Sequence, residues 1–147
     1  MLEITIGSFI ASLGFGILFN IKGKNLFLAA IGGSLGGIVY QLCFDMGASD
    51  LSAMFIASIC ISLYSEILAR IAHTPVTTYI ICALIPLVPG GGMYRTMLAA
   101  IQGKVIDALT LGLETITIAG ALVLGILLVS TITKGITKRK KAKEVKI

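Results

Sequence analysis

The sequence predicts an all-α polytopic membrane protein with about five transmembrane helices, from its composition and its long uncharged segments. Of its 147 residues, 56% are hydrophobic and only 13% are charged, whereas soluble domains are about 45–50% apolar and about 25% charged. Residues 4–21 and 25–44 contain no charged side chain, and a helix needs about 20 mostly apolar residues to cross a bilayer core. A soluble α/β fold is disfavoured because whole segments lack the polar face of a surface helix.

Short polar loops separate the predicted spans, and their residues suggest how the helices begin. Asn25 and Asp50 are of the types that cap helix amino ends, so they are predicted to cap the second and third spans. Thr74 is predicted to cap the fourth span, with Pro75 after it, because proline is favoured at the first helical position. The predicted spans are residues 4–20, 26–44, 51–69, a fourth that begins near residue 76, and 105–133.

Basic residues predict the orientation of the chain. The loop after the first span contains two lysines, the loop after the third follows Arg70, and residues 134–147 are strongly basic. The loop at residues 45–50 contains two aspartates and no cation. Because cytoplasmic loops are enriched in lysine and arginine, we expect an outer amino terminus, a transmembrane domain at residues 1–133 and a basic cytoplasmic tail at residues 134–147.

Several functional classes are disfavoured by the same composition. The net charge of +5 lies mostly in the tail after an apolar segment, which favours solvation or contact with anionic lipid over nucleic-acid binding. Cys43, Cys60 and Cys82 lack metal-type spacing and are predicted to be small buried hydrophobes. His73 has no nucleophile–base constellation around it in the sequence, so we expect no enzyme, no cofactor and no metal site.

Small residues at four-residue spacing predict close helix packing. The second span contains two overlapping G-x-x-x-G pairs, Gly32 with Gly36 and Gly33 with Gly37, and such faces allow helix backbones to approach closely in a membrane. A similar stripe in the first span is formed by Ser8, Ser12 and Gly16. These faces fit packing inside the chain or an interface with another chain, including a homo-oligomer.

Polar stripes run along the third and fifth spans. Glu66 and Arg70 continue a face that begins with Ser58 and Ser62, and they fit either a structural ion pair or a gate or proton site. Glu114 is predicted to lie in the outer leaflet, where a carboxylate costs at least a few kcal/mol unless it is paired or hydrated. Glu114 is therefore a candidate functional residue, and Asp107 is expected nearer the outer interface.

The stretch IPLVPGGGMYRTM, residues 85–97, predicts that the fourth span is broken between Pro86 and Gly92. Each proline removes a backbone donor, and glycine permits conformations that other residues resist; Gly91 is expected to need this freedom or a close approach. Only 13 residues, 76–88, precede the break, about 20 Å of helix. The break is therefore expected at membrane depth, against protein or a water-filled cavity.

The helix that resumes after the glycines is expected to begin a carboxylate site. Its free N–H groups and its dipole attract anions, and Arg95 is expected in about its first turn, where a guanidinium can bind a carboxylate. The alternative is a turn outside the membrane with Arg95 at an interface. The candidate substrate-binding residues are Gly90, Gly91, Gly92, Tyr94, Arg95 and Glu114, and the candidate coupling or gating residues are Glu66, Pro86, Pro89 and Asp107.

The segments FGILFN, SEILAR, TP and IPLVPGGGMYRTM resemble the carboxy-terminal module of the threonine/serine exporter family, over about residues 10–130. The chain looks like the small, separately encoded form of that module. The resemblance implies a bacterial-type cell membrane, a larger membrane half as partner, and proton-driven export of small hydroxy amino acids, with dicarboxylates exported by some split pairs. The positions that it marks are Glu66, Pro86, Pro89, Gly90, Gly91 and Arg95.

We therefore predict a membrane subunit of a secondary exporter for small carboxylates. Two alternatives remain open at the level of sequence: export of dicarboxylates of the succinate type, and a non-transporting assembly or scaffold subunit whose glycine faces bind a partner.

Overall fold

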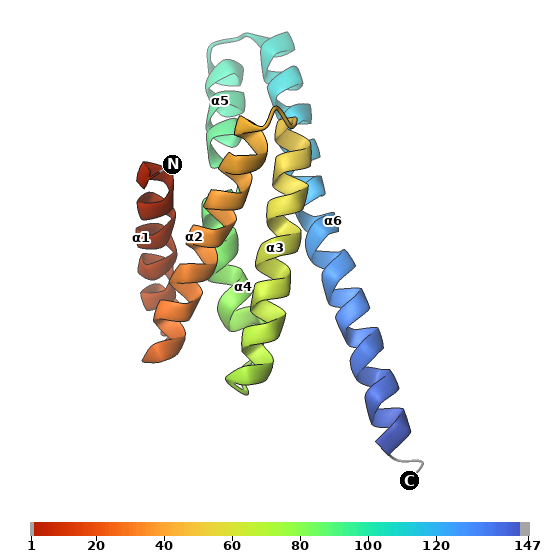
Figure 1. Cartoon of the computed structure of the whole chain (residues 1–147). Helices are drawn as coiled ribbons and strands as arrows, with labels where there is room; N and C mark the ends of the chain where they lie inside the picture. The colour runs from red at the N-terminus through yellow and green to blue at the C-terminus, as the bar shows by residue number, and fades with distance from the viewer. Residues whose placement is uncertain (1, 145–147) are drawn as a thin grey trace.

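The computed structural model describes residues 2–144, with side chains as far as residue 136, and every regular element in that range is helical. The elements are α1 (Leu2–Leu18), α2 (Lys24–Asp45), α3 (Asp50–Ile71), α4 (Thr77–Leu84), the short 3-10 turn η1 (Ile85–Leu87), α5 (Gly90–Ile101) and α6 (Val105–Glu144). The prediction of an all-α fold is confirmed (Figure 1).

The helices are long and apolar enough for a protein that crosses a membrane several times. Three qualify by length and composition, namely α2, α3 and residues 105–136 of α6, and the bent pair of α4–η1 with α5 counts as a fourth if it forms one span. The apolar helix α1 has 17 residues, about 26 Å of helix, which is near the lower limit for a crossing. With α1 included, the fold agrees with the predicted count of about five spans.

The loops are sorted between the two ends of the bundle (Figure 1). The α1–α2 loop, the α3–α4 loop and the carboxyl end of α6 lie at one end, and the amino end of α1 and the α2–α3 loop lie at the other. The basic segments that predicted a cytoplasmic side therefore share one end of the fold. The direction in which this end faces across a membrane stays a prediction.

Helix α1 packs on α2 through serine side chains that occupy the space left by glycines. A Cβ atom built on Gly33 would lie 1.8 Å from the Oγ of Ser12, and one on Gly37 would lie 2.5 Å from the Oγ of Ser8. Ser8, Ser12 and Gly16 are the buried residues of α1. The small stripe of α1 and one G-x-x-x-G pair of α2 therefore face each other, which brings the two backbones close together.

The other G-x-x-x-G pair of α2 faces a different neighbour. A Cβ on Gly32 would lie 2.9 Å from the ring of Tyr64, and one on Gly36 would lie 2.8 Å from the side chain of Ile61, both in α3. Both pairs are thus covered by helices of the same chain. The interpretation as internal packing is confirmed, and the alternative that these faces are free to bind another chain is wrong.

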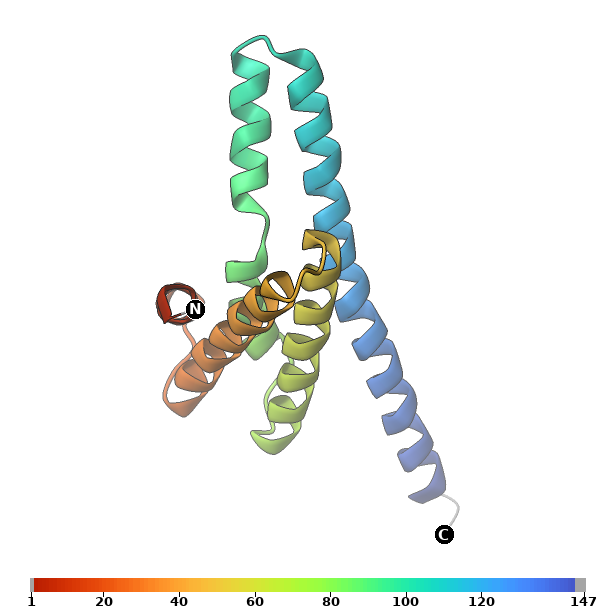
Figure 2. The same cartoon turned by 45° about the horizontal axis from the view of Figure 1, so that its top comes forward.

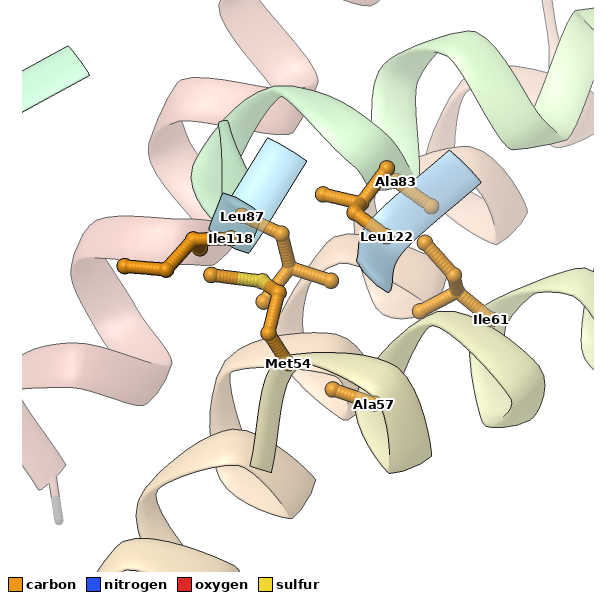
Figure 3. Close-up of a cluster of buried hydrophobic side chains, with 7 residues drawn as sticks. All are labelled: Met54, Ala57, Ile61, Ala83, Leu87, Ile118 and Leu122. Atoms are coloured by element: carbon orange, nitrogen blue, oxygen red, sulfur yellow. The ribbon is translucent and has the colours of Figure 1, made fainter. Parts of the chain in front are cut away.

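The main apolar cluster lies where α3, α4, η1 and α6 meet (Figure 3). Its side chains are Met54, Ala57, Ile61, Ala83, Leu87, Ile118 and Leu122. Leu87 is the last residue of η1 and only 3% exposed. Because Leu87 clusters with side chains of α3 and α6, the cluster fixes the position of the last residue of η1.

Asn25 and Thr74 do not cap the second and fourth spans as predicted, because both side chains bind the hydroxyl of a buried tyrosine. Gly23 precedes α2 with φ of 66°, and Val76 precedes α4. The hydroxyl of Tyr79, which is fully buried, donates to the Oδ1 of Asn25 at 3.0 Å and accepts from the Oγ1 of Thr74 at 3.2 Å. A buried hydroxyl requires partners, and satisfying it ties the first turn of α2 and the α3–α4 loop to α4.

The predicted boundary between membrane domain and tail falls inside one helix. Helix α6 has 40 residues, about 60 Å, which is about twice the thickness of a hydrocarbon core. Its apolar part ends near Ile136, and the helix continues through the basic sequence to Glu144. Residues 145–147 of the predicted tail lie outside the described residues.

The cysteines follow their prediction in part. All three are free thiols; Cys82 is buried, whereas Cys43 and Cys60 are half-buried. No group of three or more potential metal ligands occurs among the described residues.

Candidate functional site

The segment predicted as the fourth span is broken between Leu87 and Gly90, and its two parts meet at a bend of 49°, seen between the green helices in Figure 2. Val88, in an extended conformation, and Pro89 connect them. The glycines, which were expected to lie within the break, instead form the first turn of α5. The predicted break is therefore confirmed, but its extent is shorter than Pro86–Gly92.

The prolines explain where the helix stops. Pro89 has no N–H to donate to the carbonyl of Ile85, and the N–H of Val88 binds that carbonyl instead at 3.3 Å, which tightens the last turn into η1. The first i to i−4 bond of α5 runs from the N–H of Met93 to the carbonyl of Pro89 at 3.1 Å. The N–H groups of Gly91 and Gly92 precede this bond at a helix amino end, where such groups are available to a ligand.

A pocket of about 270 Å³ opens beside the break. It is lined by residues 86–92, by Arg95 of α5, by the first turns of α3 and by α6 between residues 111 and 118. Of the predicted residues, it contains Pro86, Pro89, Gly90, Gly91, Gly92, Arg95 and Glu114. Residues that are far apart in the sequence thus surround one cavity.

Opposite charges line this pocket without forming an ion pair. Arg95 lies in the second turn of α5 rather than the first, because the helix already begins at Gly90. Its Nε donates to the carbonyl of Gly91 at 3.3 Å, and no ion pair joins it to a carboxylate among the described side chains. Glu114 lines the pocket from α6 and is exposed. The guanidinium is therefore available to an anion that enters the pocket.

Asp50 and Tyr40 also line the pocket, and the sequence did not point to them as site residues. Asp50 was predicted to cap α3, but Ser49 takes that role, its Oγ accepting from the N–H of Ser52 at 3.3 Å. The carboxylate of Asp50 instead accepts a hydrogen bond from the hydroxyl of Tyr40. The acidic loop at residues 45–50, which lacks a cation, was the feature of the sequence that could have indicated Asp50 as a site residue. Only the fold shows that this loop ends beside the break.

The break lies level with the first turns of α3 rather than with its middle. The pocket reaches Asp50 and Met54, the first and fifth residues of α3. Beyond the break, α5 and the first part of α6 form a hairpin that projects past the α2–α3 loop (Figure 1). The expectation that the break lies at membrane depth stays a prediction, and the fold places it nearer one end of α3.

Three predicted residues lie outside this pocket. Tyr94 is exposed on α5, and Asp107 lines a separate groove with Arg95 and Lys104 near the tip of the α5–α6 hairpin. Glu66 lies near the other end of α3, where its carboxylate is 3.6 Å from the Nη2 of Arg70. The predicted ion pair is therefore present, remote from the break.

The polar stripe of α3 is buried inside the bundle. Ser58 is fully buried, Ser62 is 1% exposed and Glu66 is 9% exposed. The hydroxyls of Ser62 and Ser65 are buried without a hydrogen-bond partner among the described residues. In a hydrocarbon setting such groups are costly unless water or a ligand reaches them, so this stripe is a second polar region within the bundle.

Gly92, and not Gly91, is the glycine that a close approach requires. A Cβ on Gly92 would lie 2.5 Å from the Oγ1 of Thr115, whereas nothing lies within 4 Å of one on Gly91. Neither residue has a positive φ. The expectation that Gly91 needs backbone freedom or close approach is therefore wrong for contacts within this chain.

We expect Gly92→Ala to destabilise the folded protein by about 1–3 kcal/mol, the usual range for overpacking, because α5 must move away from Thr115. Gly91→Ala is the matched control and should change the stability by less than about 1 kcal/mol. Denaturant unfolding in detergent micelles measures both. Equal effects of the two substitutions would contradict the packing of α5 on α6 at Gly92.

Comparison with known proteins adds one match. The sequence model of the family described as threonine/serine exporter, ThrE, matches residues 4–132. No solved structure matches this chain.

Proposed function

Because this chain belongs to the threonine/serine exporter family, we propose that it is a subunit of a proton-coupled secondary exporter for small hydroxy amino acids. Membership makes it a multi-pass membrane protein of an exporter family rather than of an enzyme family. The observation that carries the finer proposal is the pocket at the break, in which Arg95 and the amino end of α5 face Glu114 and Asp50.

The pocket suits a zwitterion. The carboxylate of the substrate would bind the Arg95 guanidinium and the N–H groups at the start of α5. The ammonium group would lie near Glu114 or Asp50, and the hydroxyl of Thr115 could meet a substrate hydroxyl. A volume of about 270 Å³ leaves room for a small amino acid with water.

The charges favour amino acids over dicarboxylates. The pocket contains one cation, Arg95, and two carboxylates, Glu114 and Asp50. A second substrate carboxylate would approach like charges, whereas an ammonium group is attracted to them. Export of succinate-type dicarboxylates is therefore the less favoured alternative.

A carboxylate in the pocket is also the natural carrier of the coupling proton. Glu114 is our first candidate, because it lines the substrate pocket and its loss or gain of a proton changes the charge that the ammonium group meets. Glu66 is the second candidate, because it lies in the buried polar stripe of α3. Asp107 is third, since it lines the outer groove.

A larger membrane chain is the proposed partner. The α5–α6 hairpin exposes apolar side chains over its length, among them Met93 at 55%, Ile101 at 81% and Ile106 at 80%. The hairpin projects beyond α1, α2 and α3 (Figure 2), so its exposed apolar side chains are within reach of a second chain. We propose that the basic end of the bundle is cytoplasmic and that the amino terminus is outside.

The proposal is tested in proteoliposomes that contain this chain with its larger membrane partner and are loaded with labelled threonine. An imposed proton gradient should accelerate threonine efflux several-fold over the rate after an ionophore dissipates the gradient. Unlabelled serine should compete and succinate should not. Glu114→Gln should reduce the response to the gradient. Efflux that is indifferent to the gradient would refute proton coupling, and efficient competition by succinate would favour the dicarboxylate alternative.

A further inference from the structure

Pro86 leaves the carbonyl of Cys82 without its helical donor. In a regular helix the N–H of residue 86 would bind the carbonyl of residue 82, and proline has no N–H. Cys82 is fully buried, in the part of the bundle where α4 packs on its neighbours. An unsatisfied carbonyl in such a place is disfavoured, both in a protein interior and in lipid.

Ser12 of α1 supplies the missing donor. Its Oγ donates to the carbonyl of Cys82 at 2.9 Å, across 70 positions of sequence. Ser12 is itself fully buried, and Gly33 of α2 leaves the space in which its hydroxyl lies, since a Cβ there would be 1.8 Å away. The hydroxyl is thus enclosed and directed at the one carbonyl that Pro86 leaves free.

The same bond connects α1 to the break. Cys82 is in α4, and Pro86 lies one turn later, in η1, where it lines the pocket. We propose that Ser12 is a positioning residue for the pocket: its hydroxyl replaces the amide that Pro86 lacks and holds the end of α4 so that α5 begins at Gly90. Helix α1 contributes no side chain to the lining of the pocket, and this bond gives it a defined effect on the pocket.

A double-mutant cycle tests the bond. Ser12→Ala should lower the equilibrium constant for folding of the full chain in micelles about tenfold, because the buried carbonyl of Cys82 loses the hydroxyl that donates to it. In a Pro86→Ala background, residue 86 regains an N–H, and the same Ser12→Ala change should lower that constant less than about threefold. Equal losses in the two backgrounds would overturn the assignment of the hydroxyl as a substitute for the proline amide.

Amide hydrogen exchange tests the positioning. Exchange of the Val88 and Met93 amides, which are hydrogen-bonded on either side of the break, should accelerate about tenfold in Ser12→Ala, because the segment before the break is less firmly held. Ser8→Ala is the matched control: Ser8 lies one turn away on the same buried face, facing Gly37, and no hydrogen bond is recorded for its hydroxyl within the described residues. In Ser8→Ala, exchange of the Val88 and Met93 amides should match the wild type.

Unchanged exchange in Ser12→Ala, or equal acceleration in both variants, would show that Ser12 only fills space between α1 and α2. This inference depends on the proposed function only in taking the pocket as the substrate site. Folding stability and amide exchange are measured without transport. Both tests therefore remain decisive even if the chain does not export threonine. Where export is found, the apparent KM for threonine should rise in Ser12→Ala and stay unchanged in Ser8→Ala.

Discussion

Arg95→Ala is expected to reduce threonine export about a hundredfold in proteoliposomes while leaving the protein folded and assembled. Charge-assisted hydrogen bonds contribute about 1.5–3 kcal/mol each, and about 2.7 kcal/mol corresponds to a hundredfold change in rate. The side chain is exposed and makes no ion pair with the described carboxylates, so its removal should not unfold the bundle. The measurement is the initial rate of efflux at equal amounts of reconstituted protein.

Lys104→Ala is the matched control for this substitution. Lys104 is also an exposed cation of the α5–α6 hairpin. It lies near the tip and lines the separate groove that contains Asp107, and it does not line the pocket. Its replacement should leave export within about twofold of wild type, an effect of a few tenths of a kcal/mol. Arg95→Lys should be intermediate, because an ammonium group is a point charge and cannot bind a carboxylate through two parallel bonds.

Full activity of Arg95→Ala would favour the alternative function. A subunit that only assembles with its partner would keep its interface and lose nothing when the guanidinium is removed. The scaffold hypothesis assumed that the glycine faces of α2 bind a partner, but both G-x-x-x-G pairs are covered by α1, α3 and α4 of the same chain. It would then have to rely on the exposed α5–α6 hairpin as its binding surface.

Gly125→Ala is expected to separate α6 from α3 and to lower the free energy of unfolding by about 2–3 kcal/mol, in the upper part of the range for overpacking. A Cβ on Gly125 would lie 1.8 Å from the Oγ of Ser58 and 3.0 Å from the carbonyl oxygen of Phe55. The serine has little freedom to move, because its hydroxyl donates to that same carbonyl at 2.7 Å. Denaturant unfolding in micelles gives the change in stability.

Gly120→Ala provides the comparison on the same helix. No heavy atom lies within 4 Å of a Cβ at Gly120, so this change should be neutral or stabilise α6 by up to about 1 kcal/mol through helix propensity. If both alanine variants unfold at the same denaturant concentration, α6 does not pack on α3 through Gly125.

The spans and the break could be predicted because they depend on local sequence. Long uncharged segments define helices in a membrane regardless of their neighbours, and a proline in the interior of such a segment, as at Pro89, interrupts the helix. The limits of the break were missed because Gly90, Gly91 and Gly92 tolerate a helix as well as a turn. The choice was made by packing, since Gly92 in its helical position fits closely against Thr115.

The site could be predicted only where its residues are close in sequence or carry an unpaired charge. Arg95 follows the glycines directly, and Glu114 was recognised as a carboxylate in an apolar helix. Asp50 and Tyr40 were missed because their place beside the break depends on how α2, α3 and α6 are arranged. The wrong cap at Asn25 has the same cause, because Asn25 binds Tyr79 of α4, which is 54 positions away in the sequence.

The uninterrupted course of α6 has a mechanical consequence. Glu114, near the start of α6, lines the pocket. Further along the same helix, the carbonyl of Thr133 accepts a hydrogen bond at 3.5 Å from the Nη2 of Arg70, at the other end of α3. A stiff rod that pivots where it crosses α3 at Gly125 moves its two arms in opposite directions. A movement of α6 at the pocket would therefore be accompanied by an opposite movement at the Arg70 end of the bundle.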